Sequence, residues 1–244
     1  MRIHADDPWF QSQPRRSLGR RLAERLARAT GVVSRATGAG AGTNSPGRIL
    51  ERLSPGYIAD QAAALTDGTV VVSGTNGKTT TTSMIRDIMW RQGFTVVSNS
   101  TGGNLPSGIA SALLSAPWSA RMGVFEVDEA VLPRMVAMLR PRVLVLTNVF
   151  RDQLDRFGEP DRVLALFREA VGLLPVEATV VANADDCWLW DAIADAGPVG
   201  FGVVPASVPG GREGSTPGAD PEACPACGNE LTAERRSAAN LGSF

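Results

Sequence analysis

Residues 69–80 read TVVVSGTNGKTT, a short β-branched run followed at once by a loop with two glycines, a lysine and two threonines. The run predicts a strand over Thr69–Val72, and the residues beyond the loop predict a helix over Ser83–Gln92. A glycine-rich loop between a strand and a helix wraps phosphate groups with its backbone N–H groups, at the positive end of the helix dipole. In such a loop Lys78 reaches the β- and γ-phosphates, and the Thr79 hydroxyl binds Mg²⁺.

The loop is a shorter variant of the Walker pattern, because Val72 stands where the full pattern has its first glycine. The competing interpretation is a glycine-rich turn beside a surface lysine. It is disfavoured because a predicted strand and helix flank the loop, and because Lys78 is the only lysine among 24 basic residues. An ammonium is a compact charge that fits inside a phosphate-wrapping loop, unlike the wide guanidinium fork. The residues expected to bind ATP are Gly74, Thr75, Asn76, Gly77, Lys78, Thr79 and Thr80.

The composition of the 244-residue chain is that of a globular protein, with 43% hydrophobic and 20% charged residues. The formal net charge of −1 gives no global field that would favour nucleic acid. The one histidine, His4, lies near the N-terminus, which excludes a Ser–His or Cys–His pair and a histidine-based metal site from the body of the chain. The sequence has three cysteines, no apolar leader and no run of about 18 apolar residues. A cytoplasmic location is therefore expected, which includes the inner face of the membrane.

Strand and helix patterns alternate along the central part of the chain. The predicted strands are Thr69–Val72, Phe94–Ser98, Met122–Val127, Val143–Asn148 and Thr179–Asn183, and the predicted helices are Ser83–Gln92, Pro106–Ser115, Val131–Arg140, Arg162–Leu173 and Trp188–Ala196. This alternation predicts an α/β fold with a parallel sheet flanked by helices on both faces. The core is expected to begin near Leu65, and from Gly200 the pattern dissolves into Gly, Pro and Ser.

A basic amphipathic helix is predicted over Arg15–Ala29, with Leu18, Leu22 and Leu26 on one stripe and arginines on the other faces. Residues 1–50 hold nine arginines against three acidic residues, a local charge of +6. Such a helix could lie at the inner face of an anionic membrane. The favoured alternative is that it packs on its own domain and exposes a solvated arginine face.

Three carboxylates, Glu126, Asp128 and Glu129, lie at or just beyond the end of the predicted strand Met122–Val127. Ligands of open α/β sheets collect beyond the carboxyl ends of the strands, and Mg²⁺ beside phosphates is held by one or two carboxylates. Glu126 is therefore the preferred magnesium ligand, the alternative being a solvated acidic loop. Polar runs also follow the next two strands, at 148–159 and 183–186. Each alone fits helix capping, but with the loop they line one edge of the sheet.

Five motifs together resemble the Mur ligase family, which includes the folylpolyglutamate synthases. They are GTNGKTT (74–80), TGGNLPSG (101–108), FEVDEA (125–130), TNVFRDQLDRFGE (147–159) and NADD (183–186). The resemblance covers about residues 42–244. It implies that 42–203 is the central ATP-binding domain, preceded by a basic segment with a Gly-rich linker at 1–41 and followed by a loop and ribbon segment at 204–244.

The resemblance also implies roles for single residues. It implies that Thr75 to Thr80 bind the triphosphate, that Thr79 and Glu126 bind magnesium, and that Asn183 lies near the adenine. Asn104 and Asp152 match motif positions close to the γ-phosphate and the metal. Lys78, Glu126 and Asp152 are thereby the implied catalytic residues.

The run at 148–159, the stretch GTNSPGRI (42–49) and a CxxC motif resemble, within the family, the ligase-like subunits that amidate lipid II. The resemblance implies that ATP phosphorylates the α-carboxyl of the D-glutamate in lipid II. Ammonia from a GatD-type glutaminase then attacks the acyl phosphate, which leaves D-isoglutamine. Phosphoryl transfer to a carboxylate relies on positioning and cations more than on side-chain nucleophiles, so the lack of a usable histidine is no obstacle.

Two departures from the wider family bear on the reaction. Gln153 stands where the wider family has a metal-binding histidine. A glutamine at this position resembles the lipid II-amidating branch. The chain has no second lysine, whereas amino-acid-adding relatives use a carbamylated lysine. This disfavours an amino-acid ligase of the Mur or folylpolyglutamate type. A nucleotide-binding module without catalysis is the other alternative.

Cys224 and Cys227 form a CPAC motif, which is half of a zinc ribbon. A tetrahedral structural site needs four ligands, and the sequence lacks the second pair, so an incomplete Zn²⁺ site is expected. By the same resemblance, the C-terminal ligase domain is expected to be absent from these residues. Cys187, beside Trp188 on a predicted helix, is expected to be a core thiol.

Overall fold

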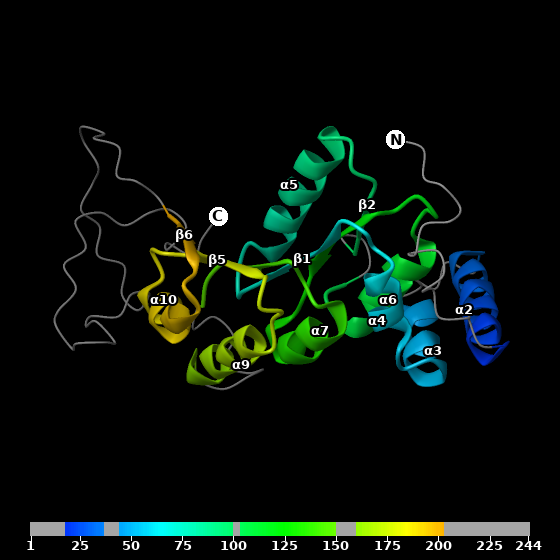
Figure 1. The fold of residues 1–244 in the computed structure, drawn as a ribbon. Helices are drawn as coiled ribbons and strands as arrows, with labels where there is room; N and C mark the ends of the chain where they lie inside the picture. Colours follow the sequence, from blue (N-terminus) through cyan, green and yellow to red (C-terminus); the bar gives the residue numbers. More distant parts are fainter. Residues whose placement is uncertain (1–17, 37–43, 100–102, 150–159, 203–244) are drawn as a thin grey trace. The chain divides into compact units, whose positions relative to one another are not determined.

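A computed structural model describes residues 18–36, 44–99, 103–149 and 160–202 (Figure 1). Six strands form one parallel sheet in the order β2-β3-β1-β4-β5-β6. The strands are β1 (Gly68–Ser73), β2 (Val96–Ser98), β3 (Met122–Glu126), β4 (Val143–Leu146), β5 (Thr179–Asn183) and β6 (Val199–Phe201). The helices are α2 (Leu18–Ala36), α3 (Ser45–Leu53), α4 (Tyr57–Ala63), α5 (Lys78–Arg91), α6 (Pro106–Ser115), α7 (Leu132–Leu139), α9 (Pro160–Gly172) and α10 (Cys187–Ile193). The predicted α/β fold with a parallel sheet is confirmed.

Two compact units make up the chain. Of the described residues, one unit comprises those up to Thr69 together with those in Ser83–Phe125, and the other comprises Val70–Thr82 together with those from Glu126 onward. In the first unit α3 packs against α2 and α6. A Cβ atom at Gly47 of α3 would lie 1.8 Å from the carbonyl oxygen of Ser107 in α6, so only glycine allows this close approach.

The second unit contains the parallel strands that lead to the glycine-rich loop. Val71 of β1 is opposite Leu144 of β4, which in turn is opposite Val180 of β5. Such near-continuous apolar strands are typical of a sheet covered on both faces. α9 packs against α7 and α10, and its Phe167 is fully buried.

Some elements differ from the sequence predictions. The helix after the loop begins at Lys78, five residues before the predicted start, because the loop itself turns into the first helical turn and the Thr81 N–H donates to the Gly77 carbonyl (2.9 Å). Helices α3 and α4 and strand β6 were not predicted. The core also begins earlier than Leu65, since Leu50, Tyr57 and Ile58 are buried.

Helix α2 packs on its own domain as favoured, but with a face other than the leucine stripe. Ala23 and Ala27 are 1% and 0% exposed, whereas Leu18, Leu22 and Leu26 are 85%, 59% and 46% exposed. The buried face carries small side chains, which let α3 approach closely, and the pair Arg20–Glu24 (3.2 Å). Arg20 also pairs with Asp60 and lies over the Tyr57 ring. Within the described residues, no helix has the length and apolar character needed to cross a membrane.

Candidate phosphate-binding site

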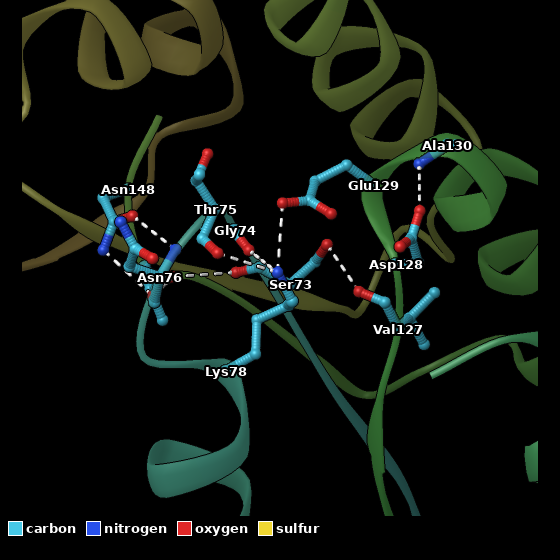
Figure 2. Close-up of polar contacts among 11 residues, drawn as sticks. Ser73, Gly74, Thr75, Asn76, Lys78, Val127, Asp128, Glu129, Ala130 and Asn148 are labelled. Carbon is cyan, nitrogen blue, oxygen red and sulfur yellow. Dashed lines mark hydrogen bonds and ion pairs between the residues drawn. The ribbon is translucent and has the colours of Figure 1, made fainter. Parts of the chain in front are cut away.

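The loop from Ser73 to Lys78 joins β1 to α5 and is packed tightly at its first glycine (Figure 2). Gly74 has φ +133°, and a Cβ atom there would lie 2.1 Å from Oγ1 of Thr147 and 2.9 Å from the Asn148 nitrogen. No side chain fits such a space, and the positive φ is itself strained for any residue but glycine. Gly74 therefore sets the path of the chain as it leaves the sheet.

Residues that follow β4 hold the middle of the loop. The Asn76 N–H donates to Oδ1 of Asn148 (2.9 Å), and Nδ2 of Asn148 donates back to the Asn76 carbonyl (3.1 Å). The Thr147 hydroxyl donates to the same carbonyl (2.7 Å), and the Thr75 N–H donates to the Asn148 carbonyl (2.9 Å). The loop is thus fixed to the carboxyl end of the neighbouring strand before any ligand binds (Figure 2).

The Lys78 ammonium lies within the curve of the loop. Its Nζ donates to the Gly74 carbonyl, to the Thr75 carbonyl (2.9 Å) and to Oε1 of Glu129 (3.1 Å). The Lys78 side chain is 13% exposed, so these acceptors replace most of its water. The three acceptors use the three N–H donors of the ammonium, so a phosphate oxygen bound by Lys78 would replace one of them.

Glu129 is the buried carboxylate of the site, and its residue is 8% exposed. Burial raises the pKa of the Glu129 carboxyl above its ordinary value, and the Lys78 ammonium offsets this only in part. Asp128 caps the short 3₁₀ turn Glu129–Val131 by accepting from the Ala130 N–H (3.0 Å). The Ser73 hydroxyl donates to the Val127 carbonyl (2.9 Å), which fixes the start of this turn beside β1.

The far end of the loop is open to solvent. Asn76, Gly77, Thr79 and Thr80 are exposed, and no heavy atom of the described residues lies within 4 Å of a Cβ built at Gly77. The first four N–H groups of an α-helix have no partner within the helix, so this end presents donors to an anion. The site therefore combines exposed backbone donors, one enclosed ammonium and a carboxylate beside it.

Other residues singled out in the sequence lie elsewhere or outside the description. Asn183, at the end of β5, is buried and its Oδ1 accepts from the Asp185 N–H (3.0 Å). Asn104 is half-buried just before α6, in the other unit. Cys187, predicted as a core thiol, is only half-buried as the first residue of α10. Asp152, Gln153, Cys224 and Cys227 lie outside the described residues.

Two contacts of the loop were not predicted from the sequence. Glu129, the third of the candidate carboxylates, contacts Lys78, because the 3₁₀ turn after β3 carries it back toward the loop. Thr147, within the predicted strand Val143–Asn148, donates its hydroxyl to the Asn76 carbonyl and so holds the loop. The one signal available was that a polar pair, Thr147–Asn148, ends an otherwise apolar strand.

The strand, glycine-rich loop and helix on a parallel sheet define a P-loop α/β domain. The chain belongs to the Mur ligase family, since residues 72–208 match the family model of the Mur ligase middle domain.

Two relatives are subunits of lipid II isoglutaminyl synthase. The chain is 36% identical over 163 residues to the glutamine-hydrolysing synthase subunit MurT of Staphylococcus aureus (strain COL), a match that covers 66% of this chain and 36% of the relative. It is 37% identical over 149 residues to the MurT subunit of Streptococcus pneumoniae (strain ATCC BAA-255 / R6), covering 60% and 33%. The chain thus spans about a third of the length of the curated relatives it matches.

A solved structure supports the fold. The MurF ligase of Thermotoga maritima, in complex with ADP, superposes with a TM-score of 0.53 at 21% identity, covering 64% of this chain and 36% of that one. Among the described residues, no group of three or more His, Cys, Asp or Glu side chains is arranged to hold a metal.

Proposed function

We propose that this chain is the ATP-binding part of an ATP-dependent carbon–nitrogen ligase of the MurT type. The observation that carries the proposal is the enclosed Lys78, held beside Glu129 by a loop of the family's middle domain. Similarity to two MurT subunits supports the choice of branch within the family. The proposed reaction converts the α-carboxyl of the D-glutamate in lipid II to the carboxamide of D-isoglutamine, at the inner face of the membrane.

The proposed chemistry has two steps. The carboxylate oxygen attacks the γ-phosphorus of ATP, the bond to the β-phosphate oxygen breaks, and an acyl phosphate and ADP result. The nitrogen lone pair of ammonia then attacks the acyl carbon, phosphate leaves with the C–O electron pair, and the nitrogen loses a proton. Both steps move negative charge among phosphate oxygens, which preorganised cations and backbone donors stabilise.

The residues of the loop take the binding roles in this proposal. Lys78 binds the β- and γ-phosphates, and the exposed backbone from Gly77 to Thr80 binds phosphate oxygens. Gly74, Thr75 and Asn76 shape the loop around the phosphates. Asn183 is assigned to the adenine side, and Asn104 and Asp152 to the γ-phosphate and metal side, as the family resemblance implies.

The donor set fits a magnesium ion bound together with the nucleotide. Mg²⁺ in such sites takes one or two carboxylates and keeps phosphate oxygens and water as its other ligands, so a cage of several side chains is not required. The oxygen donors proposed for the ion are the exposed Thr79 hydroxyl and the Glu126 carboxylate, and Glu129 follows Glu126 by three residues. When bound, the ion neutralises charge on the β- and γ-phosphates.

Ammonia is the proposed nucleophile, delivered by a GatD-type glutaminase as partner. Within residues 1–244 the one lysine is Lys78, which the loop encloses, and this favours ammonia over an amino acid as the nucleophile. The named role of the MurT relatives as subunits of a glutamine-hydrolysing synthase supports a partner that supplies ammonia.

The test is reconstitution of the protein that contains this chain with a GatD-type glutaminase, glutamine, Mg·ATP and lipid II. We expect amidated lipid II and ADP in equal amounts, both lost in Lys78→Ala and kept in the control Arg91→Ala at the exposed end of α5. An unamidated lipid II with intact nucleotide binding would reduce the chain to a nucleotide-binding module. Incorporation of an amino acid in place of ammonia would assign it to the amino-acid ligases.

A further inference from the structure

The exposed face of α2 carries a continuous leucine stripe. Leu18, Leu22 and Leu26 lie one turn apart on the side of the helix that faces away from α3, and all three are well exposed. At 1.5 Å per residue the stripe is about 12 Å long. Single exposed apolar residues are common on protein surfaces, but aligned ones mark interaction surfaces. This row of exposed leucines therefore indicates a binding surface.

Basic residues flank the stripe along one side. Arg21, Arg25 and Arg28 are exposed and recur every three or four residues, so they lie on one face of the helix beside the leucines. The one acidic residue of α2, Glu24, is buried and paired with Arg20 (3.2 Å). The exposed surface of the helix therefore carries positive charge only, beside an apolar row.

We infer that this leucine–arginine face of α2 binds the surface of an anionic lipid bilayer. A helix that lies in the interface buries its apolar row among the acyl chains, while flanking arginines reach the anionic headgroups with their long side chains. A second copy of the chain fits less well, because pairing two such stripes brings the arginine rows of both copies together. The inference rests on the proposed function for its purpose, since a lipid-linked substrate is reached from the membrane surface.

The packing of α2 makes the face available without any rearrangement. Its small residues Ala23 and Ala27 are buried, so the helix is anchored to its own unit by the opposite side. Replacing the leucines leaves the buried contacts of Ala23 and Ala27 in place, so the variants should stay folded, with an unfolding midpoint lowered only by the partial burial of Leu22 and Leu26 and by the lower helix propensity of serine. Deletion of the helix is a poorer test, because it would expose the face of α3 that α2 covers.

The experiment is co-sedimentation of the full chain with vesicles that contain no lipid II. Mixed phosphatidylglycerol–phosphatidylcholine vesicles are compared with pure phosphatidylcholine vesicles. Wild type should bind the anionic vesicles, and added salt should weaken binding. The triple variant Leu18→Ser/Leu22→Ser/Leu26→Ser should bind on the order of a hundredfold more weakly. The triple variant Arg21→Gln/Arg25→Gln/Arg28→Gln should lose about fivefold per arginine on the anionic vesicles.

A matched control tests whether loss of any exposed apolar side chain weakens vesicle binding, or only loss of the leucines of α2. Trp118 and Val176 are 99% and 98% exposed on other parts of the surface, and Trp118→Ser/Val176→Ser should bind vesicles like the wild type. Equal binding of wild type and the leucine variant, equal binding of wild type to both kinds of vesicle, or no binding at all would overturn the inference. A dimer seen by gel filtration without vesicles and lost in the leucine variant would reassign the face to a second copy and also overturn it.

Failure of this inference can be told apart from failure of the proposed function. Mg·ATP binding is measured on the same variants. If the wild type binds nucleotide but not vesicles, only the inference about the membrane-binding face of α2 is rejected. If the wild type binds vesicles but not nucleotide, only the proposed ligase function is rejected.

Discussion

The two glycines of the phosphate loop share a positive φ but lie in opposite surroundings. Gly74 is enclosed, with Thr147 and Asn148 where a side chain would be, whereas Gly77 faces open space within the described residues. Thr75 and Asn76, which follow Gly74, are bonded to Thr147 and Asn148 after β4, although Asn76 is itself exposed. Gly77, Thr79 and Thr80 at the open end are exposed. One end thus fixes the loop to the sheet, and the other leaves room for a ligand.

The largest expected effect is a difference in stability between substitutions at the two glycines. Gly74→Ala places a methyl group 2.1 Å from Oγ1 of Thr147 on a strained backbone, and should lower the free energy of unfolding by about 3 kcal/mol or more. Gly77→Ala meets only the strain of its φ of +81°, which costs about 1 kcal/mol. Urea unfolding followed by circular dichroism measures both. Equal losses would show that the two ends do not differ in packing.

Lys78 follows Gly77 in the chain, but its ammonium reaches back to the carbonyls of Gly74 and Thr75, and it should dominate nucleotide affinity. Lys78→Ala removes the enclosed charge and should weaken Mg·ATP binding by at least about tenfold. Lys78→Arg should weaken it nearly as much, because three acceptors already enclose the ammonium and leave no room for a planar fork. Fluorescence titration with a nucleotide analogue gives the affinities, with Arg91→Ala as the control. Near-normal affinity of the arginine variant would contradict the point-charge role.

A pair of threonine variants sharpens the same contrast. Thr147→Val removes the hydroxyl that donates to the Asn76 carbonyl, and should cost about 1 kcal/mol of stability. Thr79→Val alters an exposed hydroxyl at the open end and should leave stability unchanged while weakening the magnesium dependence of nucleotide binding. Thermal unfolding and titration with and without Mg²⁺ separate the two. A stability loss in Thr79→Val larger than that in Thr147→Val would reverse the assignment.

The smallest effect concerns pH. Because burial raises the pKa of Glu129 above 4.5, the folded state binds its proton more tightly than the unfolded state does. This contribution to stability is present at low pH and is lost as pH rises through the raised pKa. In Glu129→Gln the dependence should vanish while the side chain can still accept from Lys78. As pH rises, the unfolding midpoint of Glu129→Gln should therefore increase relative to that of the wild type. A difference that stays constant with pH would exclude a raised pKa.

Much of the loop could be predicted from the sequence, because its glycines, its lysine and its place between a strand and a helix are local features. The contact between Lys78 and Glu129 could not be predicted, since it depends on the 3₁₀ turn that Asp128 caps and on the bond from Ser73 to Val127. The bonds Ser73–Val127 and Lys78–Glu129 join segments far apart in the sequence.

The buried face of α2 could not be predicted from the sequence either, although the helix itself could. Periodicity located the leucine stripe correctly but did not show which side of the helix is buried. The buried side is chosen by the fit of Ala23 and Ala27 to α3 and by the pairs of Arg20, all of which depend on the fold of the unit. A large apolar side chain is therefore a weaker guide to burial here than a small one.

Hydrogen–deuterium exchange of the full chain with and without Mg·ATP tests most directly whether the open end of the loop is where the nucleotide binds. We predict slower exchange on binding in peptides that span Gly77–Thr80, since those N–H groups gain phosphate partners. The segment after β4 that holds the enclosed end should change little, because its bonds to the loop already exist. Unchanged exchange at Gly77–Thr80 in the presence of saturating Mg·ATP, or protection confined to other segments, would contradict the account.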